Sequence, residues 1–190
     1  MDKSIEEKLI KDIGEKRYNH SVRVMKTAIK LAEIYNADIE KTKVAAILHD
    51  CAKIIDETNL LKRTYDFDII LDACMEHNHE LIHGPLGAKI AEEEYGVKDI
   101  QILDAIYYHT TGRENMNILD KIIYMADYIE PYRNFLGVEE IRKLAFEYLD
   151  KSLILAMEKT IIFLIENNKL IHPDTIKARN YLLIDSSLNN

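Results

Sequence analysis

Residues 45–54 read AAILHDCAKI, an apolar run that a histidine and an aspartate, His49 and Asp50, interrupt. Apolar side chains recur around this pair at intervals of three and four residues, the spacing of one face of an amphipathic helix; they are Val44, Ile47, Leu48, Cys51, Ile54 and Ile55. Asp38 is a suitable N-cap for this helix. The pair alone carries little weight, because a chain with seven histidines contains roughly half a His-Asp pair by chance. Its meaning depends on which polar residues converge on it.

The same helical spacing dominates the rest of the chain. Six glycines and three prolines in 190 residues argue against a loop-rich or all-β fold. We predict an all-α protein, a single-domain helical bundle over residues 1–190, which is long enough to bury a substantial core. Gly14 is expected to end a first short helix. Further helices are predicted over residues 18–35, 39–55, 57–65, 68–76, 85–95, 99–109, 117–130, 138–149, 151–167 and from 173 onward.

The amino-acid composition indicates which kinds of molecule the protein can bind and where it is located. A net charge of −8 disfavours binding to nucleic acid, because neutralising phosphates requires a cationic surface. No apolar run approaches the roughly 20 residues that span a bilayer, and MDKSIEEKLI lacks the features of a signal peptide. Cys51 and Cys74 lack CxxC spacing, so we expect reduced thiols. We therefore expect a cytoplasmic protein with a small-molecule partner rather than a nucleic acid or a membrane.

Four histidines fall on different predicted helices or helix ends: His20, His49, His83 and His109. Two aspartates, Asp50 and Asp127, interrupt apolar helical runs. An unpaired buried charge costs several kcal/mol, so such groups are normally paired, protonated or bound to a metal ion. One buried histidine needs no special explanation, but several inward-facing ones in one small domain indicate a metal site. Imidazoles with carboxylates suit a transition metal, and the absence of cysteine ligands argues against structural zinc.

The motifs in their order along the chain resemble a known family. His20, then His49-Asp50, then Asp127 is similar to the H…HD…D signature of HD-domain metal-dependent phosphohydrolases. The surrounding strings resemble the YqeK family, the HD-domain symmetrical bis(5′-nucleosyl)-tetraphosphatases. They are YNHSVRV (18–24), LHDCAK (48–53), HGPLGA (83–88), HTTGRENM (109–116) and IIYMADYIEPYR (122–133). The resemblance covers about residues 17–133, and the C-terminal helices, about 138–185, carry no motif.

This resemblance implies an all-helical hydrolase that cleaves diadenosine tetraphosphate into two molecules of ADP. It also implies two divalent or mixed-valence transition metal ions, in a dinuclear iron centre that activates a hydroxide. Asp50 would bridge the two ions; His20, His49 and Asp127 would complete one site, and His83 and His109 the other. Iron, manganese, cobalt, nickel and zinc all accept such ligands, so the sequence does not choose among them.

Three cations flank the implied ligands and are candidates for binding phosphates. Lys53 follows Asp50 by three residues, Arg113 lies in the turn after His109, and Arg133 follows the helix of Asp127. Arginine binds phosphate through two hydrogen bonds, and lysine acts as a point charge. We expect all three, together with Asp50, to contribute to catalysis. The alternative is that these residues are solvated charges on the surface, as most lysines and arginines are.

Other polar residues have simpler explanations. His77 and His79, in a polar segment, are expected to be solvated or to lie at the rim of a substrate site, and His172 to enter a helix. Thr110 and Thr111 are either phosphate donors or helix caps. A tyrosine near the motifs is a candidate to stack on adenine, but the sequence does not choose among Tyr107, Tyr108, Tyr128 and Tyr132. The C-terminal helices are either core or the face of a homodimer.

Two other functions are open at this point. The chain is alternatively an HD-domain phosphohydrolase of another nucleotide, a cyclic nucleotide or an alarmone. It is otherwise a module that binds nucleotides without catalysis, although such a module would not need six ligands. A helical scaffold with a structural metal is the remaining reading, and in that case replacing Asp50 would unfold the protein.

Overall fold

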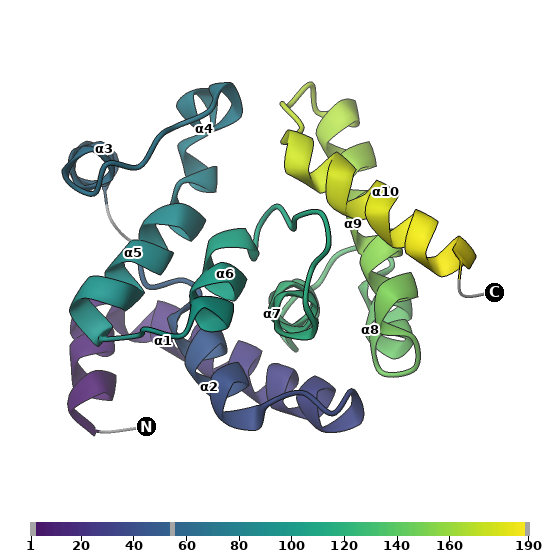
Figure 1. The fold of residues 1–190 in the computed structure, drawn as a ribbon, viewed down its shortest axis with the longest axis horizontal. Coiled ribbons are helices and arrows are strands. Elements are labelled where there is room, and N and C mark those ends of the chain that lie inside the picture. The colour runs from purple at the N-terminus through teal and green to yellow at the C-terminus, as the bar shows by residue number, and fades with distance from the viewer. Residues whose placement is uncertain (1–2, 54–55, 189–190) are drawn as a thin grey trace.

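Helices make up the whole of the regular structure in residues 3–53 and 56–188, the part of the chain that the computed structural model describes. Ten α-helices and one 3₁₀ helix occur there, without a strand, which confirms the predicted all-α class (Figure 1). In chain order they are α1 (Lys3–Ile34), α2 (Ile39–Leu48), α3 (Glu57–Asp66), α4 (Ala73–His77), η1 (His79–Leu81), α5 (His83–Tyr95), α6 (Ile100–Tyr108), α7 (Ile118–Ile129), α8 (Val138–Ala145), α9 (Leu149–Glu166) and α10 (Pro173–Leu188).

Helix α7 lies at the centre of the molecule. It contacts α1, α2, α6, α8 and α9, and Figure 1 shows it nearly end-on between α6 and the C-terminal helices. A capping box begins this helix: the Asn117 side chain accepts from backbone amides, and Asp120 binds back to the Asn117 amide. Its apolar residues are buried on several sides, among them Ile122, Ile123 and Ala126, each 0% exposed. The helix ends at Ile129, just before Pro131, as the sequence predicts.

Two helices form one long element at the N-terminus. Gly14 interrupts α1 with a φ of 74° and a ψ of 155°, so the predicted helix end at this glycine corresponds to a sharp break. After the break, Val24, Ala28 and Leu31 face the core with 0% exposure and pack α1 against α2 and α7. This apolar face places His20 toward the centre of the bundle.

Helix α2 is shorter than predicted. The periodicity suggested a helix through Ile55, but α2 ends at Leu48, and His49 is its C-cap. The chain continues as turns, in which the amide of Cys51 donates to the Leu48 carbonyl (2.9 Å) and the amide of Lys53 to the Asp50 carbonyl (2.9 Å). Residues 54 and 55 lie outside the described part. His49 and Asp50 therefore project from a helix end, and not from a helix interior.

The predicted helix 68–76 also begins later than expected. Asp72 accepts hydrogen bonds from the amides of Cys74 (2.8 Å) and Met75 (2.9 Å), which starts α4 at Ala73. His172 Nε2 lies 2.6 Å from the Asp72 carboxylate and joins this region to the start of α10. His172 thus precedes a helix as predicted, and it also ties α10 to α4.

The string HGPLGA begins α5 and explains why this helix packs closely on α6. A Cβ atom at Gly84 would lie 2.4 Å from the carbonyl oxygen of Tyr107, a distance that only glycine allows. One turn later, Gly87 faces Ile106 and accepts a hydrogen bond from the Cys51 thiol (3.3 Å) at its carbonyl. This close approach brings the first residue of α5, His83, toward the end of α6.

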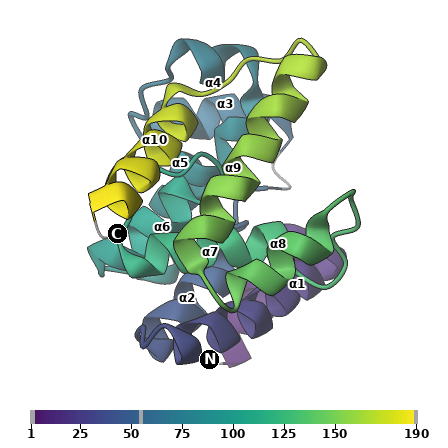
Figure 2. The same ribbon diagram turned by 90° about the vertical axis from the view of Figure 1, so that its right-hand side faces the viewer.

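The C-terminal helices cover α7 from the other side. Helix α9 packs on α7, and α8 and α10 pack on α9; Figure 2 shows α9 running across the face of the molecule with α10 beside it. The sequence suggested helices over 138–149 and 151–167, and the structure places the break between Ala145 and Leu149. Among the described residues, no helix is long and apolar enough to cross a membrane.

Candidate metal centre

Asp50 is the central side chain of a cluster of histidines buried among the helices. Its Oδ2 atom lies 3.5 Å from His20 Nε2 and 3.3 Å from His49 Nε2. Asp127 is on the same side, with Oδ1 3.0 Å from His20 Nε2 and 3.9 Å from His49 Nε2. Ligand atoms that share a transition metal at about 2.1 Å are separated by roughly 3–3.5 Å, so these spacings suit one ion.

The other oxygen of Asp50 faces a second pair of rings. Its Oδ1 atom lies 3.3 Å from His83 Nε2 and 3.8 Å from His109 Nε2. Two groups with ligand atoms within 4.8 Å of one another thus share Asp50: His20 and His49 on one side, His83 and His109 on the other. The structure therefore brings together all six residues that the resemblance implies as ligands.

The rings are oriented as metal ligands usually are. His49 Nδ1 lies 2.7 Å from the Ala46 carbonyl and His109 Nδ1 2.7 Å from the Ile106 carbonyl, and His83 Nδ1 contacts the Glu80 carbonyl. A carbonyl accepts a hydrogen bond, so each Nδ1 carries the proton and each Nε2 carries a lone pair.

These lone pairs lack partners that would satisfy them. His83 Nε2 and His109 Nε2 are 2.9 Å apart, a repulsive arrangement of two lone pairs unless a proton or a cation intervenes. The Nε2 atoms of His20 and His49 are buried without a hydrogen-bond partner in the described part of the chain. Buried polar groups are normally satisfied, so four Nε2 atoms directed at a carboxylate fit two metal ions.

The charge states of Asp50 and His109 also suit metal binding. Burial would raise the pKa of Asp50, but the neighbouring His49 and His83 rings hold that pKa well below its usual range. Burial, together with the nearby His83 and His49, lowers the pKa of His109 to about 3. Burial would also lower the pKa of His49, but the adjacent Asp50 carboxylate outweighs it and raises that pKa. An anionic carboxylate and a neutral imidazole are the forms that bind a metal ion, so Asp50 and His109 suit binding, whereas the raised pKa of His49 favours an imidazolium whose proton a metal ion has to displace.

Glu130 orients His20, a role that the sequence analysis did not foresee. Its Oε1 atom lies 3.4 Å from His20 Nδ1, and its Oε2 atom accepts hydrogen bonds from Arg23 Nε (2.8 Å) and the Tyr132 amide (2.9 Å). Burial would raise the pKa of Glu130, but these hydrogen bonds lower it, so the carboxylate is anionic. A carboxylate behind a ligating histidine fixes its ring and increases its basicity. Its position three residues after Asp127, at the C-cap of α7, was the available signal.

Arg17 is a second residue that the sequence analysis missed. It precedes His20 by three residues in α1, which places both side chains on one face. Its Nη1 atom lies 2.8 Å from Asp50 Oδ2, the oxygen that faces His20 and His49. Arg17 thus forms an ion pair with the central carboxylate.

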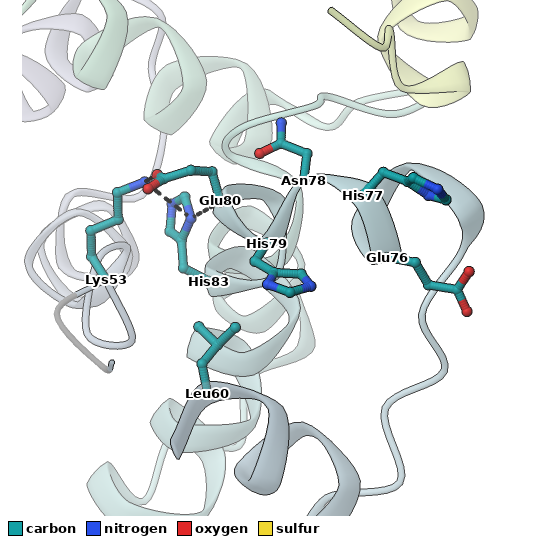
Figure 3. A pocket seen from close by; sticks show the side chains of 8 residues that line it. All are labelled: Lys53, Leu60, Glu76, His77, Asn78, His79, Glu80 and His83. Atoms are coloured by element: carbon teal, nitrogen blue, oxygen red, sulfur yellow. Dashed lines mark hydrogen bonds and ion pairs between the residues drawn. The ribbon is translucent and has the colours of Figure 1, made fainter. Parts of the chain in front are cut away.

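Lys53 lies at the opening of the centre on the His83 side. Its Nζ atom is 3.4 Å from His83 Nδ1 and forms an ion pair with Glu80, as Figure 3 shows. These three side chains line a cavity of about 450 Å³. His77 and His79 line the same cavity, from α4 and η1 (Figure 3).

The two arginines expected to bind phosphate differ in position. Arg133 Nη2 lies 2.6 Å from Asp127 Oδ1, and its side chain is 41% exposed, so the guanidinium remains accessible next to a ligand. Arg113 instead binds Asp120 (2.8 Å) and Asp104 (2.9 Å) and packs over the ring of Tyr108. Two carboxylates thus already engage Arg113, and its contact with phosphate stays a prediction.

An HD-domain family model matches residues 17–132, from Arg17 to Tyr132, and this range contains all six candidate ligand side chains. Together with the helical fold and the paired His-Asp groups, the match defines the class of HD-domain hydrolases that depend on a divalent metal.

Closely similar proteins narrow this class. The symmetrical bis(5′-nucleosyl)-tetraphosphatase of Bacillus subtilis (strain 168) is 45% identical over 174 residues, which cover 92% of this chain and 93% of that protein. The Staphylococcus aureus (strain NCTC 8325 / PS 47) protein of the same name is 43% identical over 171 residues, 89% of this chain and 88% of the relative. A crystal structure of a predicted HD superfamily hydrolase involved in NAD metabolism, from Clostridium acetobutylicum, is 44% identical with a TM-score of 0.93 and covers 96% of this chain and 97% of its own. This chain belongs to the HD-domain family, among the symmetrical bis(5′-nucleosyl)-tetraphosphatases.

Proposed function

We propose that the protein hydrolyses diadenosine tetraphosphate symmetrically, giving two molecules of ADP. The observation that carries the proposal is the arrangement of four buried Nε2 atoms around the two oxygens of Asp50. Relatives named for this activity are 43% and 45% identical along most of the chain, which supports the choice of substrate.

In this proposal, His20, His49, Asp50 and Asp127 hold one metal ion, and Asp50, His83 and His109 hold the other. Asp50 suits the bridging position because its Oδ2 faces the first pair of histidines and its Oδ1 faces the second. When bound, a metal pair supplies an acidified water molecule and neutralises charge on the phosphoryl oxygens. The surrounding apolar core excludes bulk water and keeps the ligand side chains in place.

The cations next to the centre position the polyphosphate in this scheme. Arg133 and Lys53 lie on different sides of the ligand cluster, one bound to Asp127 and the other close to His83. Arg17 joins them because its guanidinium already contacts Asp50. Arg113 does not, since the carboxylates that it contacts, Asp104 and Asp120, are not among the six candidate ligands.

Identification of the products tests the function. Protein purified anaerobically with its metal is incubated with diadenosine tetraphosphate, and the nucleotides are separated by ion-exchange chromatography. ADP as the only nucleotide product is expected, whereas ATP together with AMP would show asymmetric cleavage and contradict the proposal. Tight nucleotide binding without any turnover would favour the non-catalytic module, and faster hydrolysis of other nucleotides a different HD phosphohydrolase.

The same preparation identifies the metal. We propose iron, and elemental analysis should give about two metal ions per chain. We also propose that residues 1–190 form one domain and that the protein is cytoplasmic. A homodimer formed by the C-terminal helices is a further proposal. Size-exclusion chromatography with light scattering measures the oligomeric state directly.

A further inference from the structure

A second and larger cavity, of about 860 Å³, lies between α7 and α9. Two of the six ligand side chains, His109 and Asp127, form part of its wall, and Arg133 joins them. Cavities of this size are typical of small-molecule sites, which combine apolar walls with a few polar groups.

We propose that the cavity between α7 and α9 is the subsite for one adenine nucleoside of the substrate. The base lies against Tyr128, Phe135 and Phe163, and the phosphates extend past Arg133 to the metal ligands. This inference rests on the proposed function, because it assumes a nucleotide with a polyphosphate chain.

The aromatic side chains of the cavity offer faces on which a base can stack. The rings of Tyr128 and Phe135 meet at 78° with centroids 5.2 Å apart, so they form a corner. Phe163, on α9, is 52% exposed and Phe135 is 37% exposed, although both are large apolar side chains. Exposed apolar groups gathered at a cavity mark a binding surface, and aromatic rings bind purines through their π-faces.

The polar groups of the cavity match the other parts of a nucleotide. Thr110 Oγ1 is buried and, within the described part of the chain, has no hydrogen-bond partner. Thr110 lines the cavity next to His109, so its hydroxyl is available to a ligand. Lys159 and Arg133 add two cations to the same wall, as the phosphates require.

The smaller cavity on the other side of the centre has a different character. Apart from Leu60, the residues that line it are polar or charged, including Glu76, Asn78 and Lys53 (Figure 3). A two-ended substrate across the metal ligands would therefore have one end against aromatic rings and the other against polar side chains. The α7–α9 cavity is the one suited to hold a base by stacking.

This assignment also selects among the four tyrosines near the motifs. Tyr128 lines the α7–α9 cavity. Tyr107 and Tyr108 pack on each other with ring centroids 4.5 Å apart, and Tyr132 lies over the guanidinium of Arg23 at 4.1 Å. Of these four tyrosines, Tyr128 is the one on the cavity wall, and it is therefore the one placed to contact adenine.

Binding measurements on the metal-loaded protein test the subsite. Isothermal titration compares ADP with pyrophosphate for the wild type, Phe163→Ala and Ile165→Ala. Both positions are more than half exposed on α9, at 52% and 59%, but only Phe163 belongs to the cavity wall. We expect Phe163→Ala to weaken ADP about tenfold, since a stacked base loses its platform, and to leave pyrophosphate within about twofold. Ile165→Ala should change neither.

The outcomes separate the subsite from the overall function. Unchanged ADP affinity in both Phe163→Ala and Phe135→Ala overturns the subsite, even when the wild type converts diadenosine tetraphosphate to ADP. Equal losses for ADP and pyrophosphate also overturn it, because stacking acts on the base alone. A selective loss of ADP binding supports the subsite, even if the wild type fails to cleave the dinucleotide.

Discussion

The partners of three side chains, Asp50, Arg133 and Arg113, indicate what each of them can do at the centre. Asp50 places one oxygen toward His49 and the other toward His83, 3.3 Å from each Nε2 atom. Arg133 and Arg113 both follow ligand segments closely, yet Arg133 binds the ligand Asp127, whereas Arg113 binds the buried Asp120. Proximity in sequence to a ligand is therefore a weak guide to contact with substrate.

The two arginines should respond differently to replacement by alanine. Arg133→Ala removes an accessible cation next to Asp127, so we expect the KM for diadenosine tetraphosphate to rise about tenfold or more with little change in stability. Arg113→Ala leaves the 2%-exposed Asp120 carboxylate without its cation and should lower the free energy of unfolding by about 3 kcal/mol, with the KM changed less than about threefold. Steady-state kinetics and urea unfolding measure both effects. The reverse pattern would show that Arg113 contacts the substrate.

At the scale of helices, the close packing of α5 on α6 sets the distance between two ligands. Gly84 allows the backbone of α5 to approach Tyr107, and this approach leaves His83 Nε2 2.9 Å from His109 Nε2. Small changes in helix separation are therefore transmitted to the second metal site, because both histidines lie at helix ends. Interiors are tightly packed and do not absorb an added methyl group without movement.

Gly84→Ala should accordingly damage both stability and metal binding. The added Cβ atom would meet the Tyr107 carbonyl oxygen at 2.4 Å, so we expect a loss of about 1–3 kcal/mol and a lower metal content. Gly87→Ala is the matched control on the same helix, because its Cβ atom would make an ordinary 3.4 Å contact with the Ile106 side chain. Thermal unfolding and elemental analysis compare the two variants. Equal stability and equal metal content in the two variants would mean that α5 and α6 can move apart without loss of free energy.

At the scale of the whole molecule, the centre joins segments that are distant in sequence. The six candidate ligands come from α1, the turn after α2, α5, the end of α6 and α7, so they form a group that could hold a metal only once these elements pack together. A metal ion that binds only the folded protein adds its binding free energy to the stability. We therefore expect a bound metal to contribute part of the stability of the bundle.

Removal of the metal should lower the Tm of the wild type. A ligand at 100 times its Kd contributes about 2.7 kcal/mol, which corresponds to a shift of roughly 5–10 °C for a chain of this size. Asp50→Asn should bind little metal, remain folded, and show the same Tm with and without a chelator. Calorimetry, with metal content measured in parallel, tests this. An unfolded Asp50→Asn protein would instead favour a purely structural metal.

The sequence by itself determined the all-α class, since helical periodicity and the scarcity of glycine and proline are local properties. It also indicated the ligand residues, because histidine and aspartate in apolar helical faces are costly without a partner. Tertiary structure alone decided the end of α2 at Leu48, the contact of Arg17 with Asp50 and that of Glu130 with His20. It also decided that Arg113 binds carboxylates and that the α7–α9 cavity opens beside Asp127. These features depend on atoms from segments far apart in the chain, and local spacing carries no information about such distances.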